Sequence, residues 1–468
     1  MKREEILDTT NSMLKKHLAG QRDQQFLRYL DPDQLQELLH LEDCSDGADW
    51  PRIFQWVQMY LDHSVKTGHP GFVNRMWGAA NLPSIVGEFT AAVANTSACT
   101  FESAPVSTLM EKYMLQEMLD LAGFTNGEGQ MTTGSSNANM LAMMAARNEI
   151  LPEVKAEGLR QQSDIVGFVS ADAHYSMEKA ANILGLGTRH LIKIPVTYGG
   201  EMHVGMLVEK IEEALVEGKR PFFVGGTAGT TVRGAYDPIE KLLELRKRYG
   251  FWLHIDGAWG GAVVVSRKLR ETYLAGIEEV DSFTWDFHKM LGTSLMSNVF
   301  LINNRIHTLG KVCSAGDDSY IFHGENSNAV LDLGAISLQC GRRVDSLKWF
   351  LDWKYFGRKG FAERVEHCLS LCEHAEKIVH DSQELELVLP RSSFNLCFRY
   401  KVREERANQF NLALRTKLHH DCISLVGYAM HEGKLFLRLL LANAELTTEA
   451  IDRYFTDLIR TGKSLSGG

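Results

Sequence analysis

From Ser136 to Ile302 the chain alternates between short apolar segments and amphipathic helical stretches. The apolar segments are IVGFVS (165–170), HLIKIPV (190–196), PFFVGG (221–226), FWLHID (251–256), DSFTWD (281–286) and MSNVFLI (296–302). Strands that are apolar along nearly their whole length are typical of a mostly parallel sheet, because helices cover both of its faces. The alternation therefore predicts an α/β fold.

The chain on either side of this region has a different pattern. Apolar residues recur at helical spacing near the N-terminus. A long helical stretch from Asp345 to His380 precedes three strand-like segments, LELVLP, NLCFRY and LFLRLLL. We expect a helical N-terminal segment (1–75), a large α/β domain (76–345) and a small α+β C-terminal domain (346–468).

Composition argues against several kinds of partner. The 468 residues include 50 basic and 59 acidic side chains, with a net charge of −9 and no long basic run, so we expect no nucleic-acid partner. We expect no membrane span and no secretory signal, because no stretch is long and apolar enough and the first residues are charged. None of the eight cysteines forms a Cys-x-x-Cys pair, which predicts reduced thiols, a cytoplasmic protein and no metal site.

Two strand ends carry reactive side chains. In open α/β sheets, ligands bind outside the carboxyl ends of the strands. FWLHID ends at Asp256, and Lys289 follows thirty-three residues later, just after DSFTWD. Each residue alone has a more ordinary explanation, a capping aspartate and a solvated lysine. A lysine beside apolar residues can nevertheless act as an amine nucleophile.

Three further segments supply complementary groups. Ser135 and Ser136 open a predicted helix, where backbone N–H groups form either a phosphate site or a simple capping turn. His174 stands at a strand-to-helix junction and is either a ring-stacking group or a structural histidine, and Thr227 begins a loop rich in hydroxyls. Together with the aspartate and the lysine, these groups meet the requirements of pyridoxal phosphate. We therefore expect this cofactor.

Longer stretches resemble the pyridoxal-phosphate-dependent group II amino-acid decarboxylases, of the glutamate, cysteine-sulfinate and aspartate type. The matching stretches are HPGFVNRMWGAAN, FESAPVSTLMEK, MTTGSSNANMLAMMAARN, DAHYSMEKAANILGLGT, PFFVGGTAGTTVRGAYDPI, WLHIDGAWGGAVVVS, DSFTWDFHKMLG, LQCGRRVDSLKWFLDWK and FLRLLLANAE. The resemblance implies an aspartate-aminotransferase-like fold (PLP fold type I). It also implies a homodimer with its active site at the interface, and we expect the N-terminal segment to take part in the dimer.

The resemblance implies a role for each residue around the cofactor ring. Lys289 should bind the cofactor's aldehyde, and Asp256 should pair with the pyridine nitrogen. His174 should stack on one face of the ring, and Ala258 should pack against the ring. Lys289, Asp256 and His174 are therefore the expected catalytic residues.

Other matching residues should bind the phosphate and the phenolic oxygen. Ser135, Ser136 and His288 are expected to contact the phosphate. Thr227 should lie beside the phenolic oxygen or beside Asp256. The family usually has Asn-Pro before the His-Lys pair, but this chain has a carboxylate, Asp286, at the asparagine position. That carboxylate either raises the pKa of the cofactor lysine or points away from it.

The substrate residues follow from the same resemblance. Arg438 matches the arginine that is expected to hold the α-carboxylate, a group that guanidinium binds well. Asn74 and Arg75 match an asparagine-glutamine pair that lines the side-chain pocket in the family. The arginine in place of glutamine favours an anionic or strongly polar substrate side chain.

One departure concerns the proton that replaces the lost carboxyl group. Many relatives have a loop tyrosine for this purpose, and alignment places Ser327 at that position. A serine hydroxyl is shorter and far less acidic than a phenol. The proton then comes from another group, such as His323 or a residue of the partner chain, or from water. Otherwise the alignment is shifted and Tyr320 is the nearest upstream tyrosine.

These residues predict α-decarboxylation of a small acidic L-amino acid to the amine and CO2. The expected substrates are aspartate, cysteine sulfinate, cysteate or glutamate. Because of Ser327, the alternative is decarboxylation-dependent transamination or an oxidative deamination that yields an aldehyde. A scaffold without activity is a further alternative, against which the retained lysine, aspartate and histidine argue.

Overall fold

The computed structural model describes residues 1–22, 25–40, 46–159, 164–314, 318–322 and 331–466. The chain groups into two compact units, each with its own sheet. The larger unit comprises residues 80–372 and 389–395, and the smaller unit comprises residues 1–79, 373–388 and 396–468. The N-terminal helices and the C-terminal strands thus belong to one compact unit, and the three-part division expected from the sequence stays a prediction.

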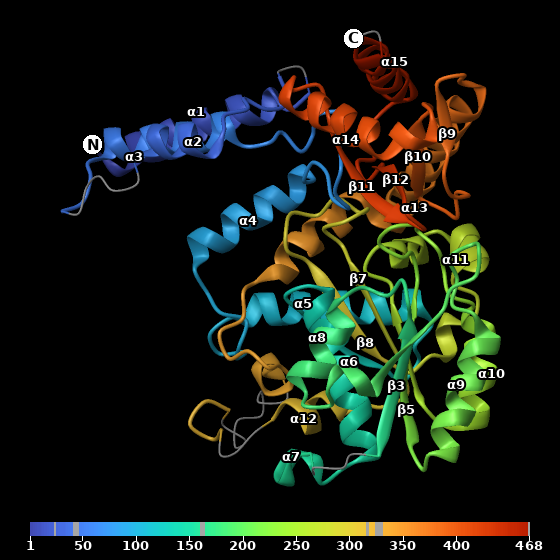
Figure 1. Ribbon diagram of the computed structural model, residues 1–468. Coiled ribbons are helices and arrows are strands. Elements are labelled where there is room, and N and C mark those ends of the chain that lie inside the picture. Colours follow the sequence, from blue (N-terminus) through green and yellow to red (C-terminus); the bar gives the residue numbers. More distant parts are fainter. Residues whose placement is uncertain (23–24, 41–45, 160–163, 315–317, 323–330, 467–468) are drawn as a thin grey trace. The chain divides into compact units, whose positions relative to one another are not determined.

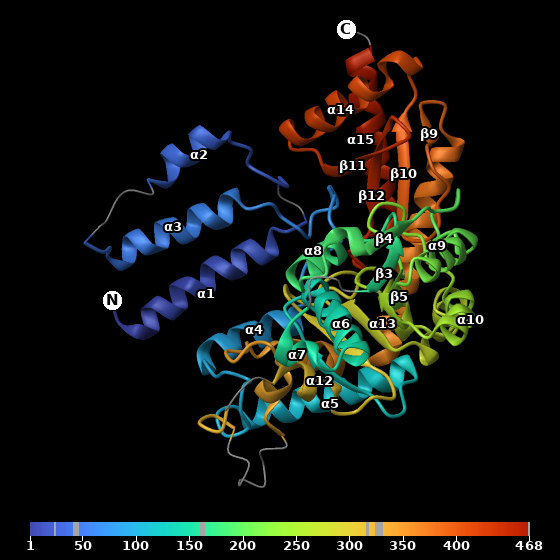
Figure 2. The same cartoon turned by 60° about the horizontal axis from the view of Figure 1, so that its bottom comes forward.

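The larger unit has a seven-stranded sheet in the order β2, β8, β7, β6, β5, β3, β4 (Figure 1). Its strands are β2 (Glu128–Met131), β3 (Ile165–Ser170), β4 (Leu191–Ile194), β5 (Arg220–Thr227), β6 (Trp252–Asp256), β7 (Ser282–Asp286) and β8 (Asn298–Ile302). Neighbours from β7 to β4 pair in parallel, whereas β8 pairs antiparallel with both β2 and β7. The mostly parallel α/β sheet expected from the sequence is confirmed. Figure 2 shows β3, β4 and β5 side by side.

Helices cover both faces of this sheet. The helices of this unit are α4 (Leu82–Ala94), α5 (Pro105–Ala122), α6 (Ser135–Ile150), α7 (Val154–Glu157), α8 (Ser176–Ile183), α9 (Val204–Val216), α10 (Ile239–Tyr249), α11 (Arg267–Tyr273), α12 (Thr308–Cys313) and most of α13 (Asp345–Asp381), with 3-10 turns at Thr188–His190, Gly260–Val265, Ile277–Glu279 and Leu333–Ile336. A side chain at Gly225 would meet Met177 of α8, and one at Gly226 would meet Leu242 of α10. Successive strand residues point to opposite faces, so α8 and α10 lie on opposite sides.

Helix α6 reaches the strand ends because its sheet-facing side is small. Its buried residues include Ala138, Ala142 and Ala145, which pack into one apolar cluster with Val169 and Phe223 of the sheet. Small side chains let the helix axis approach the strands closely, and burial of large partners such as Val169 and Phe223 stabilises the fold by about 1.5–3 kcal/mol per side chain. The N-terminus of α6 is thereby held rigidly.

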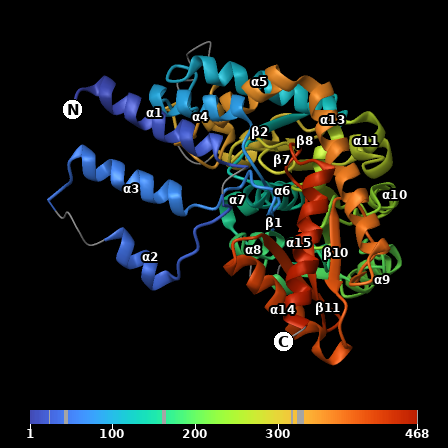
Figure 3. The same cartoon turned by 90° about the horizontal axis from the view of Figure 1, so that it is seen from above.

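The smaller unit has a five-stranded sheet in the order β1, β11, β12, β10, β9. Its strands are β1 (Phe72–Val73), β9 (Leu385–Leu387), β10 (Asn395–Tyr400), β11 (Leu425–His431) and β12 (Lys434–Leu440), and α14 (Glu404–His420) and α15 (Thr448–Ser466) lie beside it (Figure 3). Strand β1 pairs in parallel with β11, so the chain just after β1 lies next to the C-terminal strands.

The N-terminal helices of the smaller unit are α1 (Arg3–Ala19), α2 (Pro32–Leu39) and α3 (Trp50–His63). Asp31 and Asp49 cap the second and third of these helices, and each aspartate accepts a hydrogen bond from a backbone N–H of the first turn. Among the described residues, no helix combines the length and the apolar character needed to cross a bilayer.

Candidate active site

Asp256 ends strand β6 with a buried carboxylate that two neutral donors hold in place. Its Oδ2 accepts a hydrogen bond from Asn139 Nδ2 at 2.7 Å, and its Oδ1 accepts one from the Ala258 backbone N–H at 3.0 Å. Asn139 stands one turn after Ser135 on α6. A buried carboxylate among neutral donors strongly favours a cationic partner. Asp256 is therefore suited to hold a protonated ring nitrogen.

A chain of hydrogen bonds fixes the orientation of Asn139. Its Oδ1 lies 2.9 Å from His254 Nε2, and His254 Nδ1 lies 2.8 Å from Ser282 Oγ. Ser282 Oγ accepts a hydrogen bond from Trp252 Nε1 at 2.8 Å. Burial lowers the pKa of His254 to about 4, so its ring is neutral at pH 7. The hydrogen bonds can then all point one way, from the Trp252 indole, which can only donate, to the Asp256 carboxylate, which can only accept.

Neither Asn139 nor His254 was predicted from the sequence as a residue of this site. The signal for His254 was its place two residues before Asp256, because alternate residues of a strand share one face. Asn139 lies near the start of the helix that was expected to bind phosphate, and its sequence context is that of an ordinary polar helix residue.

His174 lies in the loop between β3 and α8, and Ser176 links it to the network at Asp256. His174 Nδ1 is 2.9 Å from Ser176 Oγ, which accepts a hydrogen bond from Asn139 Nδ2 at 3.0 Å. Burial lowers the pKa of His174, while the charge of Asp256 opposes this shift and that of Lys289 adds to it. The histidine is therefore within electrostatic reach of both residues, and its lowered pKa favours a neutral ring that can stack.

Lys289 forms an ion pair with Asp286, the last residue of β7. Lys289 Nζ is 2.9 Å from Asp286 Oδ2, with the lysine side chain 20% exposed and the carboxylate 3% exposed. Burial alone would raise the pKa of Asp286, but the charges of Lys289 and His288 outweigh it and hold that pKa below its usual value. Of the two orientations left open by the sequence, the carboxylate adopts the one that faces the lysine.

The N-terminus of α6 meets the same carboxylate. The backbone N–H and the hydroxyl of Ser135 donate to Asp286 Oδ1 at 3.3 and 3.1 Å. Asn298 Nδ2 donates to the same oxygen at 2.7 Å and to Ser135 Oγ at 2.9 Å. Ser135 is buried, whereas Ser136 is exposed. His288, also buried, has its Nδ1 2.7 Å from the backbone oxygen of Ser297, and burial lowers its pKa.

Thr227, at the end of β5, is paired in register with Asp256. Its backbone N–H donates to Asp237 Oδ2 at 2.7 Å, but within the described part of the chain its buried Oγ1 has no hydrogen-bond partner. Burial raises the pKa of Asp237 to about 7, against the opposing effect of N–H donors from Met202 and Thr227. A buried hydroxyl of this kind is suited to an oxygen atom of a bound ligand.

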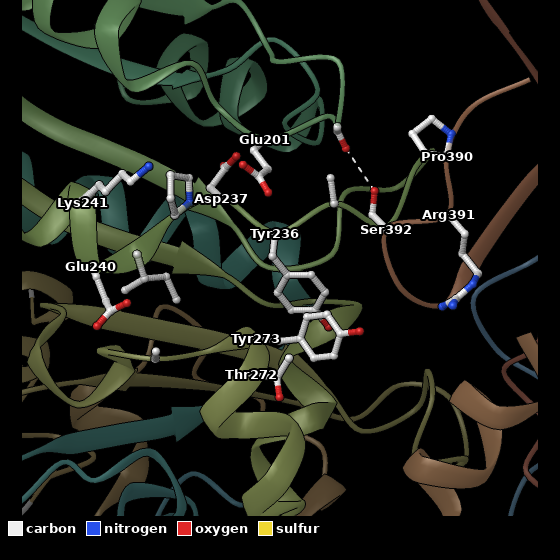
Figure 4. A pocket seen from close by; sticks show the side chains of 15 residues that line it. Glu201, Tyr236, Asp237, Glu240, Lys241, Thr272, Tyr273, Pro390, Arg391 and Ser392 are labelled. Atoms are coloured by element: carbon white, nitrogen blue, oxygen red, sulfur yellow. Dashed lines mark hydrogen bonds between the residues drawn. The ribbon is translucent and has the colours of Figure 1, made fainter. Parts of the chain in front are cut away.

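Asp237 also lines a cavity of about 470 Å³, and Figure 4 shows the side chains around it. The rings of Tyr236 and Tyr273 face each other with centroids 4.7 Å apart, and Ser392 Oγ donates to the Gly199 backbone oxygen at 3.0 Å. None of the described residues that the sequence assigns to the cofactor lines this cavity.

The three residues expected to bind substrate lie together in the smaller unit. Arg438 on β12 donates from Nη2 to the Asn74 backbone oxygen at 3.2 Å, and Asn74 directly follows β1. Burial lowers the pKa of Arg438, Cys397 opposes this shift, and the charge of Arg75 adds to it. Asn74 is buried and Arg75 is exposed. A side chain at Gly427 would meet both Asn74 and Arg438, so glycine leaves room between them.

Of the three loop residues considered for the proton transfer, two lie outside the described part of the chain. Ser327 and His323 are not among the described residues. Tyr320 is described, and its side chain is 77% exposed. The structure therefore leaves the identity of the proton donor as a prediction.

A mostly parallel sheet with a lysine, a carboxylate and a histidine near its strand ends is the arrangement expected of a pyridoxal-phosphate enzyme. The chain belongs to the pyridoxal-dependent decarboxylase family, because the model of the pyridoxal-dependent decarboxylase conserved domain matches residues 32–401. Pyridoxal phosphate is accordingly its cofactor. The residues present fit that group, since the unpartnered Thr227 hydroxyl and the anion-binding start of α6 both offer donors.

Curated relatives align along nearly the whole chain. The acidic amino acid decarboxylase GADL1 of Bos taurus is 33% identical over 447 residues, covering 93% of this chain and 85% of the relative. The human cysteine sulfinic acid decarboxylase is 34% identical over 455 residues, covering 94% and 92%. The crystal structure of mouse CSAD superposes with a TM-score of 0.93 at 31% identity and covers 98% of each chain. These matches confirm the predicted family and fold.

Proposed function

We propose that this decarboxylase acts on a small acidic L-amino acid, of the aspartate, cysteine sulfinate, cysteate or glutamate class, and forms the amine and CO2. The observation that carries the proposal is the pair of arginines, Arg438 and Arg75, beside Asn74. Burial and the nearby charge of Arg75 both lower the pKa of Arg438, so the two guanidinium groups together favour a ligand with two acidic groups. The names of the relatives, which act on acidic amino acids and cysteine sulfinic acid, support the same class.

The arginines divide the recognition of the substrate. Arg438 is the more buried of the two and is fixed by Asn74, so it holds the α-carboxylate that all the substrates share. Arg75 is exposed and follows directly on the fixed Asn74, so it reads the acidic group of the side chain. Asn74 lines the same pocket with its buried side chain.

In the larger unit, four residues surround the cofactor ring. When bound, pyridoxal phosphate supplies an electron sink for the bond to the leaving carboxyl group. Lys289 binds the cofactor's aldehyde through Nζ, and Asp256 keeps a proton on the pyridine nitrogen. His174 stacks on one face of the ring, and Ala258 packs against the ring.

The remaining cofactor residues bind oxygen atoms. Ser135 and Ser136 hold the phosphate with backbone and hydroxyl groups at the start of α6, and His288 contacts it as well. Thr227 donates its hydroxyl to the phenolic oxygen or to Asp256. The support for these roles is the position of the described residues around two neighbouring strand ends.

The substrate class is tested with a panel of L-amino acids, following both CO2 and the amine. Aspartate, cysteine sulfinate, cysteate and glutamate should be turned over, and asparagine, glutamine and alanine should not. Arg438→Ala should weaken kcat/KM for every substrate by about 100-fold, the loss of a charge-assisted pair. Arg75→Gln should reorder the acids, whereas Arg75→Lys, the matched control, should retain the preference for an acidic side chain. Equal turnover of neutral amino acids would contradict the proposal.

The serine at position 327 leaves an alternative reaction, in which decarboxylation is followed by transamination or by oxidative deamination. If water supplies the proton, some turnovers should end in pyridoxamine phosphate or in an aldehyde with consumption of O2. The enzyme would then lose activity within a countable number of turnovers, and added cofactor would restore the transaminated fraction. Ser327→Tyr should slow that loss. Indefinite turnover without added cofactor would remove this alternative.

We also propose that the enzyme is a cytoplasmic homodimer. The helices α4 and α5 expose apolar side chains at helical spacing. These side chains are Leu82, Val86, Phe89 and Val93 on α4, and Val106, Leu109 and Tyr113 on α5. Exposed apolar helix faces of this kind are typical of an interface between chains. The described cysteines are all free thiols, which supports a reducing compartment.

Light scattering tests the dimer. Val86→Glu should shift the protein toward a monomer, because a charge would be buried in the interface. Val216→Glu is the control, since Val216 is also an exposed valine on a helix but ends α9 instead. A wild-type monomer, or an equal effect of both substitutions, would contradict the proposed interface.

A further inference from the structure

Asp286 occupies the anion-binding end of helix α6. One of its oxygens accepts hydrogen bonds from the backbone N–H and the hydroxyl of Ser135 and from Asn298, at 3.3, 3.1 and 2.7 Å. The other oxygen is 2.9 Å from Lys289 Nζ. Both oxygens of this carboxylate, which is only 3% exposed, therefore have donors from the chain itself.

The donors on Ser135 are the ones that the proposed function assigns to the cofactor's phosphate, and the inference rests on that assignment. Helix N-termini bind anions through free N–H groups and the helix dipole. The hydrogen atoms of one serine cannot serve a carboxylate and a phosphate at full strength together. Two anions side by side also repel each other in a buried site.

The charge on Asp286 is present near pH 7. Lys289 is its direct counterion, and His288 Nε2 lies 3.9 Å from the same carboxylate oxygen. These charges hold the pKa of Asp286 below its usual value in spite of burial. Loading the cofactor would engage Lys289 and Ser135, so Asp286 would lose the free ammonium group and the two Ser135 donors together.

We propose that Asp286 is a built-in competitor of the cofactor's phosphate. In the cofactor-free protein it fills the phosphate site with a carboxylate of the chain itself, and it thereby weakens the contribution of the phosphate to cofactor binding. The asparagine that the family usually has at this position has the same shape without the charge. The cofactor is accordingly bound less tightly, and released more readily, than it would be with asparagine at this position.

The test compares two probes, pyridoxal phosphate and pyridoxal, which lacks the phosphate. Their dissociation constants are measured by equilibrium dialysis with the cofactor-free wild type and with Asp286→Asn. The ratio of the pyridoxal constant to the pyridoxal-phosphate constant isolates the phosphate, because any change at Lys289 affects both probes equally. Asp286→Asn should raise this ratio by ~10-fold or more, which corresponds to ~1.4 kcal/mol. A ratio that is unchanged within a factor of two, or that falls, would overturn the proposal.

Three further variants complete the design. Asp286→Ser also removes the charge and should raise the ratio, so the test survives if the asparagine variant fails to fold. Asp281→Asn removes another buried carboxylate, just before β7, where it is paired with Arg246 and Arg305. It should lower stability and leave the ratio unchanged. A rise of the ratio in Asp281→Asn would show that loosening alone produces the effect, and would overturn the proposal.

Ser135→Ala separates the competition from the site assignment on which it rests. If this variant lowers the ratio and Asp286→Asn leaves it unchanged, the phosphate site stands and the competition is refuted. If neither changes the ratio, the assignment of Ser135 fails and the competition fails with it. Decarboxylation of the amino-acid panel is measured separately, so an error in the substrate class leaves these binding ratios unaffected.

Discussion

Two aspartates end neighbouring strands of the same sheet, and their surroundings are opposite in character. Asp256 on β6 accepts hydrogen bonds from neutral groups, Asn139 and the Ala258 N–H. Asp286 on β7 faces the ammonium group of Lys289. The first carboxylate is oriented with its charge available for a ligand, whereas the second is already neutralised by the chain. The comparison teaches that the charge of the partner, more than burial, decides whether a buried carboxylate is ready to bind a cation.

The largest effect should come from removing the cation. Lys289→Ala should lower turnover by at least ~10⁴-fold, because no other group would bind the cofactor's aldehyde. It should also lower the free energy of unfolding by about 3 kcal/mol, because Asp286 would be left buried without its counterion. The double variant Lys289→Ala/Asp286→Asn should regain stability but not turnover. Substantial decarboxylation by Lys289→Ala would refute its role.

Asp256→Asn tests the other side of the comparison. The amide keeps the shape of the carboxylate but cannot hold a proton on the pyridine nitrogen, so kcat should fall by ~10²–10³-fold. Steady-state kinetics at saturating cofactor measures this effect, and the stability of the variant should change little by comparison. A decrease of less than tenfold would show that another group supports the ring nitrogen.

A third buried carboxylate, Asp237, accepts hydrogen bonds from the backbone N–H groups of Met202 and Thr227, and burial raises its pKa to about 7. A carboxyl group whose pKa is raised on folding stabilises the folded state at low pH and loses that effect as the pH rises toward the folded pKa. The stability of the wild type relative to Asp237→Asn should therefore fall between pH 5 and pH 7, by roughly 2–3 kcal/mol, and level off above. Urea denaturation of both proteins at several pH values measures the difference. A difference that does not change with pH would contradict the raised pKa.

The smallest effect should come from the support of Asp256. His254→Phe removes the donor to Asn139 Oδ1, so kcat should fall by about tenfold with little change in KM. His254→Gln, which can donate to the same oxygen, should restore part of the loss. If both variants behave alike, the hydrogen bond from His254 does not position Asn139.

The sequence predicted the parts of this site that depend on strand ends. Asp256, Thr227 and the region of Lys289 follow apolar segments whose strand character was clear, and parallel pairing brings such ends to one edge. Strand β2 was not predicted, because its four residues EGQM lack an apolar run. The long helix after Asp345 was predicted, but not the break at Gly357, where φ is 63°.

Contacts between distant segments could not be predicted in the same way. Asn139 and Asp256 are 117 residues apart, and only the packing of α6 on the sheet brings their side chains within hydrogen-bond distance. The direction of Asp286 also stayed open, because it depends on Asn298 of the antiparallel strand β8. These details follow from tertiary packing and not from local spacing.

The hydrogen bonds from Trp252 to Asp256 have a fixed direction, and this makes them unsuitable as a proton relay. Passing a proton along the row would require every bond to reverse, but the indole at its start has no lone pair with which to accept one. The row of hydrogen bonds thus has a structural role. It fixes the orientation of the Asp256 carboxylate and offers it no path for proton exchange through the interior of the sheet.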